Sequence, residues 1–297
     1  MKHKQVRRAL ERYRITSGKG FRLKDHDPDD TAPGLISHHE AQTLLADGVA
    51  RLAELQELLY PNGRWALLCV FQAMDAAGKD STIKHVMSGV NPQGVQVTSF
   101  KQPSSDELAH DFLWRVWRRL PERGSIGIFN RSHYEEVLVV RVHPEALAAE
   151  RLPPELTGRK IWEHRLDDIA GFERYLARQG LVILKFFLNI SFEEQKKRFL
   201  ARLDNPQKNW KFSASDIAER AHWAAYMDAY EEAIATTAAP HAPWFVVPAN
   251  HKWFTRLVVV EAMIDALEAL ELKPLEMQAP DRIRLDEARR RLSEEGQ

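Results

Sequence analysis

Two spacings of apolar residues alternate along this chain. Five short runs are mainly apolar, which is the pattern of strands that are buried on both faces of a parallel sheet. These runs are residues 66–72, 95–100, 125–130, 181–189 and 244–248. Between them, apolar residues recur three and four positions apart, and this spacing predicts helices. The predicted helices are residues 37–59, 81–88, 106–120, 162–179, 217–236 and 253–270.

Alternating strands and helices predict an α/β fold in which helices cover both faces of a parallel five-stranded sheet. In open parallel sheets, ligands bind beside the carboxyl ends of the strands. Three groups of conspicuous polar residues fall at such ends: residues 75–79, Lys101 and residues 130–132. This coincidence favours a single site at one edge of the sheet.

Residues 65–86 have the order strand, small-residue loop, helix. Such a loop turns backbone N–H groups toward an anion, and the helix N-terminus points at the same place. Against the pattern G-x-x-x-x-G-K-[ST], Gly78 and Lys79 match, whereas Ala73 replaces the first glycine and Asp80 replaces the Ser or Thr. The segment therefore predicts a phosphate-binding loop, and a Gly-Lys turn that only opens a helix is the alternative.

Asp75 is unexpected inside a loop that binds phosphate. A carboxylate 4 Å from a phosphate charge is repelled by roughly 4 kcal/mol at an effective dielectric constant of 20. The arrangement becomes favourable when Mg²⁺ bridges carboxylate and phosphate oxygens, so Asp75 predicts a metal site. Asp80 is either a second metal ligand or an ordinary acid at a helix N-terminus.

Arg131 follows the third predicted strand, where its guanidinium can reach a phosphoryl group in transfer. A salt bridge to Glu135, four residues on, is the alternative role. Glu135 and Glu136 are candidates for orienting metal-bound water or a nucleotide. We take Asp75, Lys79 and Arg131 as the catalytic candidates. The other candidate nucleotide- and phosphate-binding residues are Ala76, Ala77, Gly78, Asp80, Ser81, Lys84, Asn130, Ser132, Glu135 and Glu136.

Residues 192–220 read as a basic helical hairpin. Seven lysines and arginines and three acids lie between residues 196 and 222, which gives a local charge of about +4. The segment is interpreted as a mobile lid that closes over phosphates, or else as a generic charged hairpin. Its candidate phosphate-binding residues are Arg198, Arg202, Lys208 and Lys211.

Composition limits the remaining possibilities. The chain has 297 residues, with 42 Lys and Arg balanced by 42 Asp and Glu, so net charge identifies no partner. The single cysteine, Cys69, excludes an internal disulfide framework. The longest apolar stretch, residues 181–190, is too short to span a bilayer and contains Lys185. We therefore expect a cytoplasmic protein with no membrane segment.

The N-terminal 24 residues carry nine Lys and Arg against one acid. This arm is either a solvated tail or a segment that attracts anions. We predict three regions: a basic arm and loop at 1–36, a phosphotransferase domain at 37–272 with its lid at about 192–222, and a C-terminal tail at 273–297.

With these features assembled, the chain resembles the polyphosphate kinase 2 family. The resemblance lies in residues 73–86 (AMDAAGKDSTIKHV), 90–104, 129–145 (FNRSHYEEVLVVRVHPE), 203–213 and 243–254. Residues 23–33 are also similar to the segment that precedes this domain on its N-terminal side in the family. The FNRSHYE block makes the chain most similar to the third-class branch, which phosphorylates nucleoside mono- and diphosphates.

The resemblance implies a P-loop kinase-like three-layer α/β/α sandwich with a parallel five-stranded sheet and a helical lid. It also implies Mg²⁺ as cofactor, for which Mn²⁺ can substitute, and inorganic polyphosphate and nucleoside mono- or diphosphates as substrates. The resemblance further implies a homo-oligomer, a dimer or a tetramer, and no nucleic-acid partner is expected.

By the same resemblance, Asp75 binds Mg²⁺ and positions the acceptor phosphate, Lys79 cradles phosphate and Arg131 contacts phosphates. Lys208 and Lys211 belong to the lid, with Arg198 and Arg202 nearby. Many family members carry Asp where this chain has Asn130, which weakens a metal-binding role at that position.

Two other functions stay open from the residues alone. An ATP-dependent nucleoside-monophosphate or small-metabolite kinase would have the same fold. A non-catalytic polyanion-binding protein would suit the basic segments, but its ligand would be repelled by Asp75 and Asp80.

Overall fold

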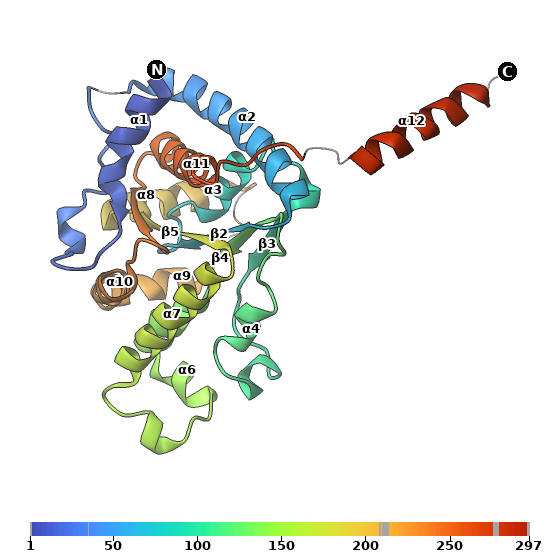
Figure 1. Ribbon diagram of the computed structural model, residues 1–297. Coiled ribbons are helices and arrows are strands. Elements are labelled where there is room, and N and C mark those ends of the chain that lie inside the picture. The colour runs from blue at the N-terminus through green and yellow to red at the C-terminus, as the bar shows by residue number, and fades with distance from the viewer. Residues whose placement is uncertain (1, 35, 208, 210–213, 276–278, 296–297) are drawn as a thin grey trace.

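The computed structural model describes residues 2–34, 36–207, 209, 214–275 and 279–295. One six-stranded sheet forms its centre, with the strand order β1-β6-β5-β2-β4-β3 (Figure 1). The strands are β1 (Arg14–Ile15), β2 (Ala66–Gln72), β3 (Val95–Ser99), β4 (Ile126–Asn130), β5 (Leu181–Asn189) and β6 (Trp244–Pro248). The five predicted strands are confirmed and are parallel, while β1 adds an antiparallel sixth strand beside β6.

Helices cover both faces of this sheet, as predicted (Figure 1). On one face α2 and α3 pack against α11, and on the other α7 packs against β5 and α10. The longer helices are α1 (Lys2–Leu10), α2 (His38–Asn62), α3 (Lys79–Val86), α7 (Ile161–Arg178), α8 (Phe192–Leu203), α10 (Trp223–Thr237), α11 (Lys252–Glu268) and α12 (Ala279–Glu294). The shorter ones are α4 (Trp114–Trp117), α5 (Val139–Val142), α6 (Pro144–Ala149) and α9 (Ala214–Glu219). Within the described residues, every helix is too short or too polar to span a lipid bilayer.

Local sequence signals explain the bounds of α2. Ser37 caps its first turn, since the Ser37 hydroxyl accepts the Glu40 N–H at 3.2 Å. The Glu40 carboxylate accepts the Ser37 N–H at 2.9 Å in return, which completes a capping box. The helix ends at Asn62, and the next residue, Gly63, caps it with a φ of 59°, in the left-handed region that glycine adopts without strain.

The single helix predicted over residues 106–120 is wrong. The chain instead forms a 3₁₀ turn at Glu107–Ala109 and the short helix α4. Between them, the Asp111 side chain accepts the Leu113 N–H at 3.0 Å. Such local bonding competes with helix formation, because it offers the backbone another partner. The predicted helix 217–236 is likewise divided into α9, a 3₁₀ turn at Arg220–His222, and α10.

The N-terminal arm is packed onto the body of the protein. Val6, Leu10 and Tyr13 are buried in the core. Arg7 pairs with Glu268 and, at 2.8 Å, with Glu261, both on α11. The arm is therefore not a solvated tail, because its apolar residues join the core and part of its positive charge is neutralised.

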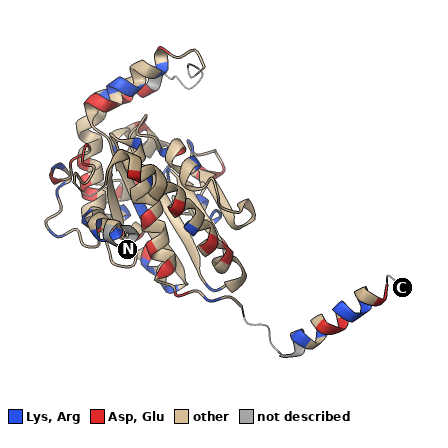
Figure 2. Ribbon diagram, turned by 90° about the horizontal axis from the view of Figure 1, so that it is seen from above, with Lys and Arg blue, Asp and Glu red and all other residues tan. Residues whose placement is uncertain are grey.

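Charge is dispersed over the rest of the surface. Figure 2 shows acidic and basic residues interspersed along the helices, and they also alternate along α12, which lies away from the sheet (Figure 1). Cys69 is fully buried in β2, and burial raises the pKa of its thiol. A thiol that is buried in an apolar strand is unreactive.

A buried ion pair joins strand β5 to helix α7. Lys185 in β5 is fully buried, and its Nζ lies 2.5 Å from Glu173 Oε2 on α7. The ammonium also donates to the Thr237 carbonyl at 2.8 Å and to the Tyr134 hydroxyl at 3.1 Å. It lies 5.2 Å from the centroid of the Trp244 ring. The charge is thus tolerated because it is paired and hydrogen-bonded.

Replacing Glu173 by Gln would leave the Lys185 ammonium buried among neutral partners. We expect the free energy of unfolding to fall by about 3–5 kcal/mol, measured by urea denaturation. The double variant Lys185→Met/Glu173→Gln removes both charges and should recover most of that loss. Equal losses in the single and double variants would contradict this account.

Candidate active site

The phosphate loop lies at the carboxyl end of β2, and α3 begins directly after it at Lys79. Gly78 precedes the helix with φ of 108°. Ala76 also adopts positive φ, 61°, which costs a residue with a side chain about 1–2 kcal/mol. The loop is therefore held in a conformation that its own sequence does not favour at Ala76, and other contacts have to support it.

The structure brings the three catalytic candidates together. Arg131 Nη2 lies 3.3 Å from Asp75 Oδ1, and Arg131 Nη1 lies 3.9 Å from Glu135 Oε2. Lys79 Nζ donates to the Ala73 carbonyl at 2.7 Å, across the loop. Parallel pairing of β2 with β4 places these groups at one edge, and the Arg131 N–H donates to the Phe71 carbonyl at 3.0 Å.

Two further candidates, Asn130 and Asp80, link the end of β4 to the first turn of α3. Asn130 Nδ2 donates to Asp80 Oδ1 at 2.7 Å. Asp80 therefore has a protein partner that bridges α3 to β4. Ser81 closes the first turn of α3, where its hydroxyl donates to the Gly78 carbonyl at 3.1 Å.

Mutual electrostatics shift the pKa values of this cluster. Burial lowers the pKa of Lys79, and Asp75 opposes that effect. Burial also opposes the charge of Arg131, but Glu135 and Asp75 outweigh it and raise its pKa. Burial raises the pKa of Glu135 against the attraction of Arg131 and Lys79. Opposite charges in a confined site are an arrangement typical of functional centres.

Three candidates lie apart from this cluster or serve the local fold. Glu136 is buried on the other side of its turn, where its carboxylate lies 3.7 Å from Arg165. Lys84 is exposed on the second turn of α3. The Ser132 hydroxyl accepts the Tyr134 N–H at 3.2 Å and caps the turn.

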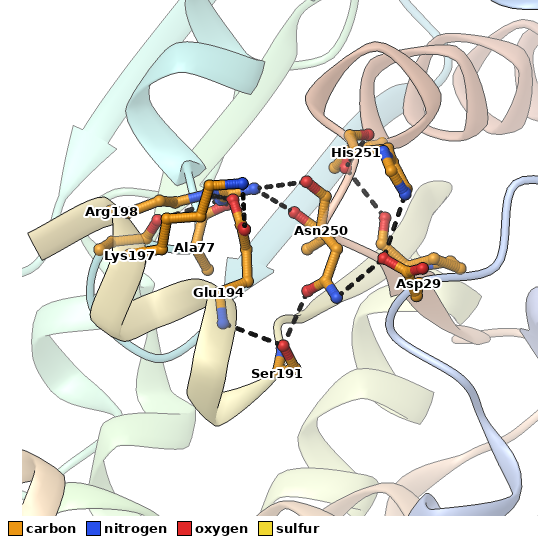
Figure 3. A network of polar contacts seen from close by, with 12 residues as sticks. Asp29, Ala77, Ser191, Glu194, Lys197, Arg198, Asn250 and His251 are labelled. Atoms are coloured by element: carbon orange, nitrogen blue, oxygen red, sulfur yellow. Dashed lines mark hydrogen bonds and ion pairs between the residues drawn. The ribbon is translucent and has the colours of Figure 1, made fainter. Parts of the chain in front are cut away.

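The lid candidates divide into three groups. Arg198 is engaged with backbone carbonyls of the phosphate loop and of the loop after β6 (Figure 3). Arg202 pairs with Asp216 of α9 at 3.2 Å. Lys208 and Lys211 lie outside the residues that the structure describes.

Two residues near the site, Gln195 and Asp216, were not among the predicted site residues. Gln195 is buried on α8 and donates to the Asp75 carbonyl at 2.9 Å. Asp216 pairs with Arg202 at 3.2 Å, and burial together with the charge of Asp75 raises the pKa of Asp216. Neither residue belongs to a recognisable motif, and only the acid's position within a basic segment could have drawn notice.

The donors suit a metal that the substrate helps to hold. Within the described part of the chain, no three His, Cys, Asp or Glu side chains gather closely enough to enclose an ion by themselves. Mg²⁺ is commonly bound by one or two carboxylates together with substrate phosphates and water. Asp75 and Glu135, on either side of Arg131, offer hard oxygens of that kind.

A phosphate loop after the first strand of a parallel sheet, with helices on both faces, defines a P-loop kinase-like α/β protein. The chain belongs to the polyphosphate kinase 2 family, because the sequence model described as Polyphosphate kinase 2 (PPK2) matches residues 35–274.

Named relatives agree with this membership. The chain is 52% identical over 246 residues to an ADP-polyphosphate phosphotransferase of Rhodopseudomonas palustris, covering 82% of this chain and 85% of the relative. It is 46% identical over 264 residues to an AMP/ADP-polyphosphate phosphotransferase of Meiothermus ruber, covering 89% and 95%. The crystal structure of polyphosphate kinase 2 from Arthrobacter aurescens is similar with a TM-score of 0.83 and 44% identity, covering 92% of this chain and 95% of that one.

The buried carboxyl group of Glu136 should make the stability of the protein depend on pH. Burial and the nearby Glu150 raise the pKa of Glu136 to about 7, against the attraction of Arg165 and Arg115. Between pH 4.5 and 7 the folded state binds a proton that the unfolded state has released, so stability falls as pH rises through this window.

Glu136→Gln removes that titration. The free energy of unfolding of the variant minus that of wild type should increase by about 3 kcal/mol as the pH is raised from 4.5 to 8. The reason is that each unit of pKa shift corresponds to about 1.36 kcal/mol. Urea denaturation at several pH values measures this difference. A wild-type minus variant difference that does not change with pH would refute the assignment.

Proposed function

We propose that this chain transfers the terminal phosphoryl group of inorganic polyphosphate to AMP and ADP, giving ADP and ATP. The observation that carries the proposal is the junction of Asp75, Lys79 and Arg131 at the ends of β2 and β4. Relatives named AMP/ADP- and ADP-polyphosphate phosphotransferase support the choice of substrates.

In the proposed reaction, an oxygen of the nucleotide's terminal phosphate attacks the terminal phosphorus of polyphosphate. A new P–O bond forms, the bond to the next phosphate breaks, and polyphosphate leaves one unit shorter. The attacking oxygen is already anionic near neutral pH, so no strong general base is needed. Catalysis then depends on positioning and on neutralising charge.

The cations of the site serve that neutralisation. Lys79 and the N–H groups of the phosphate loop would cradle one phosphate chain, while Arg131 would contact the group in transfer. Arg202, Lys208 and Lys211 would contact polyphosphate from the lid. Arg202 would then exchange its partner Asp216 for phosphate.

A divalent metal, Mg²⁺ with Mn²⁺ as a substitute, fits the same site. Asp75 would hold it, with Glu135 or Asp80 as a further oxygen ligand. When bound, the metal supplies positive charge between carboxylate and phosphate oxygens. We further propose that the protein acts in the cytoplasm as a homo-oligomer, with no nucleic-acid partner.

One assay tests the proposed function. Purified protein is incubated with polyphosphate and Mg²⁺ and with AMP, ADP, GMP or GDP, and the products are resolved chromatographically. ATP formed from ADP with polyphosphate as the only donor supports the proposal. Turnover with ATP as donor and none with polyphosphate would indicate an ATP-dependent kinase. Polyphosphate binding that is strongly salt-dependent, without turnover, would indicate a polyanion-binding protein.

Lys79→Ala and Asp75→Asn should each lower the polyphosphate-dependent rate by at least about 100-fold, because each removes a group that acts on charge in the transition state. Lys160→Ala and Asp167→Asn make the same chemical changes at exposed positions and serve as controls. Circular dichroism should show that all four variants fold. Near-normal rates in either site variant would refute the assigned roles.

A further inference from the structure

Helix α8 holds the outer side of the phosphate loop by three successive carbonyl groups. Gln195 Nε2 donates to the Asp75 carbonyl at 2.9 Å. Arg198 Nη1 donates to the Ala76 carbonyl at 3.1 Å and to the Ala77 carbonyl at 2.7 Å. We call these two side chains, Gln195 and Arg198, the carbonyl clamp.

Arg198 has no donor left for a phosphate. Its Nη2 donates to the Ala249 carbonyl at 2.6 Å and to the Asn250 carbonyl at 2.9 Å, and its Nε donates to Glu194 Oε1 at 2.9 Å (Figure 3). A guanidinium has five N–H donors, and these contacts occupy all five. The residue is only 9% exposed. Arg198 therefore joins two loops instead of offering its charge to a ligand.

The clamp determines which way the loop presents its N–H groups. In a planar trans peptide the carbonyl and the following N–H point in opposite directions. When the carbonyls of Asp75 and Ala77 are held on the outer side, the N–H groups of Ala76 and Gly78 turn to the inner side. There they join the first N–H groups of α3, which have no partner inside the helix. The N–H of Ala77 instead closes a turn to the Met74 carbonyl at 3.3 Å.

Gln195 also connects the clamp to the far end of the lid. Its Oε1 accepts from Arg220 Nη1 at 2.5 Å, and the same Nη1 donates to the Phe192 carbonyl at 3.1 Å. The Arg220 guanidinium lies 3.7 Å from the centroid of the Phe192 ring. Arg220 belongs to the 3₁₀ turn where the chain returns from the lid. The buried amide of Gln195 thus contacts both the phosphate loop and the far end of the lid.

We propose that Gln195 and Arg198 are positioning residues for phosphoryl transfer: they keep the phosphate loop open toward its anion, and Gln195 couples that loop to the lid through Arg220. The inference rests on the proposed function for its effect on rate, but the anion-binding property can be measured without turnover.

The central experiment replaces one atom group. Gln195→Glu keeps the shape of the side chain and its bond from Arg220, but it puts a carboxylate oxygen against the Asp75 carbonyl. Gln42→Glu makes the same change at an exposed position of α2 and is the control. We expect Gln195→Glu to lower kcat for ATP formation at least tenfold and to weaken binding of inorganic tripolyphosphate at least tenfold by calorimetry. The control should match wild type.

A second variant covers the case in which Gln195→Glu does not fold. Gln195→Met fills a similar volume without charge or donor, and the same tenfold losses are expected. Arg198→Lys separates two roles for that residue. A lysine keeps the positive charge but cannot reach four carbonyls, so a clamp loses tripolyphosphate affinity, whereas a direct phosphate ligand would keep most of it.

The outcomes are distinguishable. Folded Gln195 variants that bind tripolyphosphate and turn over within twofold of wild type overturn the clamp. A wild-type protein that makes no ATP from polyphosphate overturns the proposed function, while the calorimetric comparison still tests the clamp. Retained tripolyphosphate affinity in Arg198→Lys overturns the assignment of that residue.

Discussion

Parallel pairing of β2 with β4 is the constraint on which the site depends. The register sets Phe71 opposite Asn130, so the phosphate loop and Arg131 leave the sheet side by side. The backbone bond from Arg131 to the Phe71 carbonyl extends this pairing by one residue beyond the strand. Because of that register, the Arg131 guanidinium lies 3.3 Å from the Asp75 carboxylate, although the two residues are 56 positions apart in the sequence.

Like charges gathered at this edge are tolerable only because opposite charges alternate with them. Arg131 lies between Asp75 and Glu135, and Lys79 is close to both carboxylates. The same cluster is suited to two polyanionic substrates, since its cations and a carboxylate-bound metal can neutralise phosphate oxygens. Stability and proposed function therefore draw on the same charges.

The strands and most long helices could be predicted because their apolar spacing is local and strong. The failures came where a side chain competed with the backbone, as Asp111 does in the interrupted helix 106–120. The phosphate loop, Arg131 and their common edge were also predictable, because the order of strand, loop and helix fixes them. Arg198 was predicted as a phosphate ligand on its charge alone, and its four hydrogen bonds to carbonyls of loops distant in sequence were beyond such reasoning.

By itself, then, the sequence determined the α/β class, the phosphate loop and the acids and bases around it, since each is written in residues that are neighbours along the chain. Only the tertiary structure decided that the basic arm packs on α11, that Lys185 and Glu173 form a buried pair, and that Gln195 holds the Asp75 carbonyl. These contacts join segments that are distant in sequence, and a contact's partner is chosen by packing and hydrogen-bond geometry that no local pattern encodes.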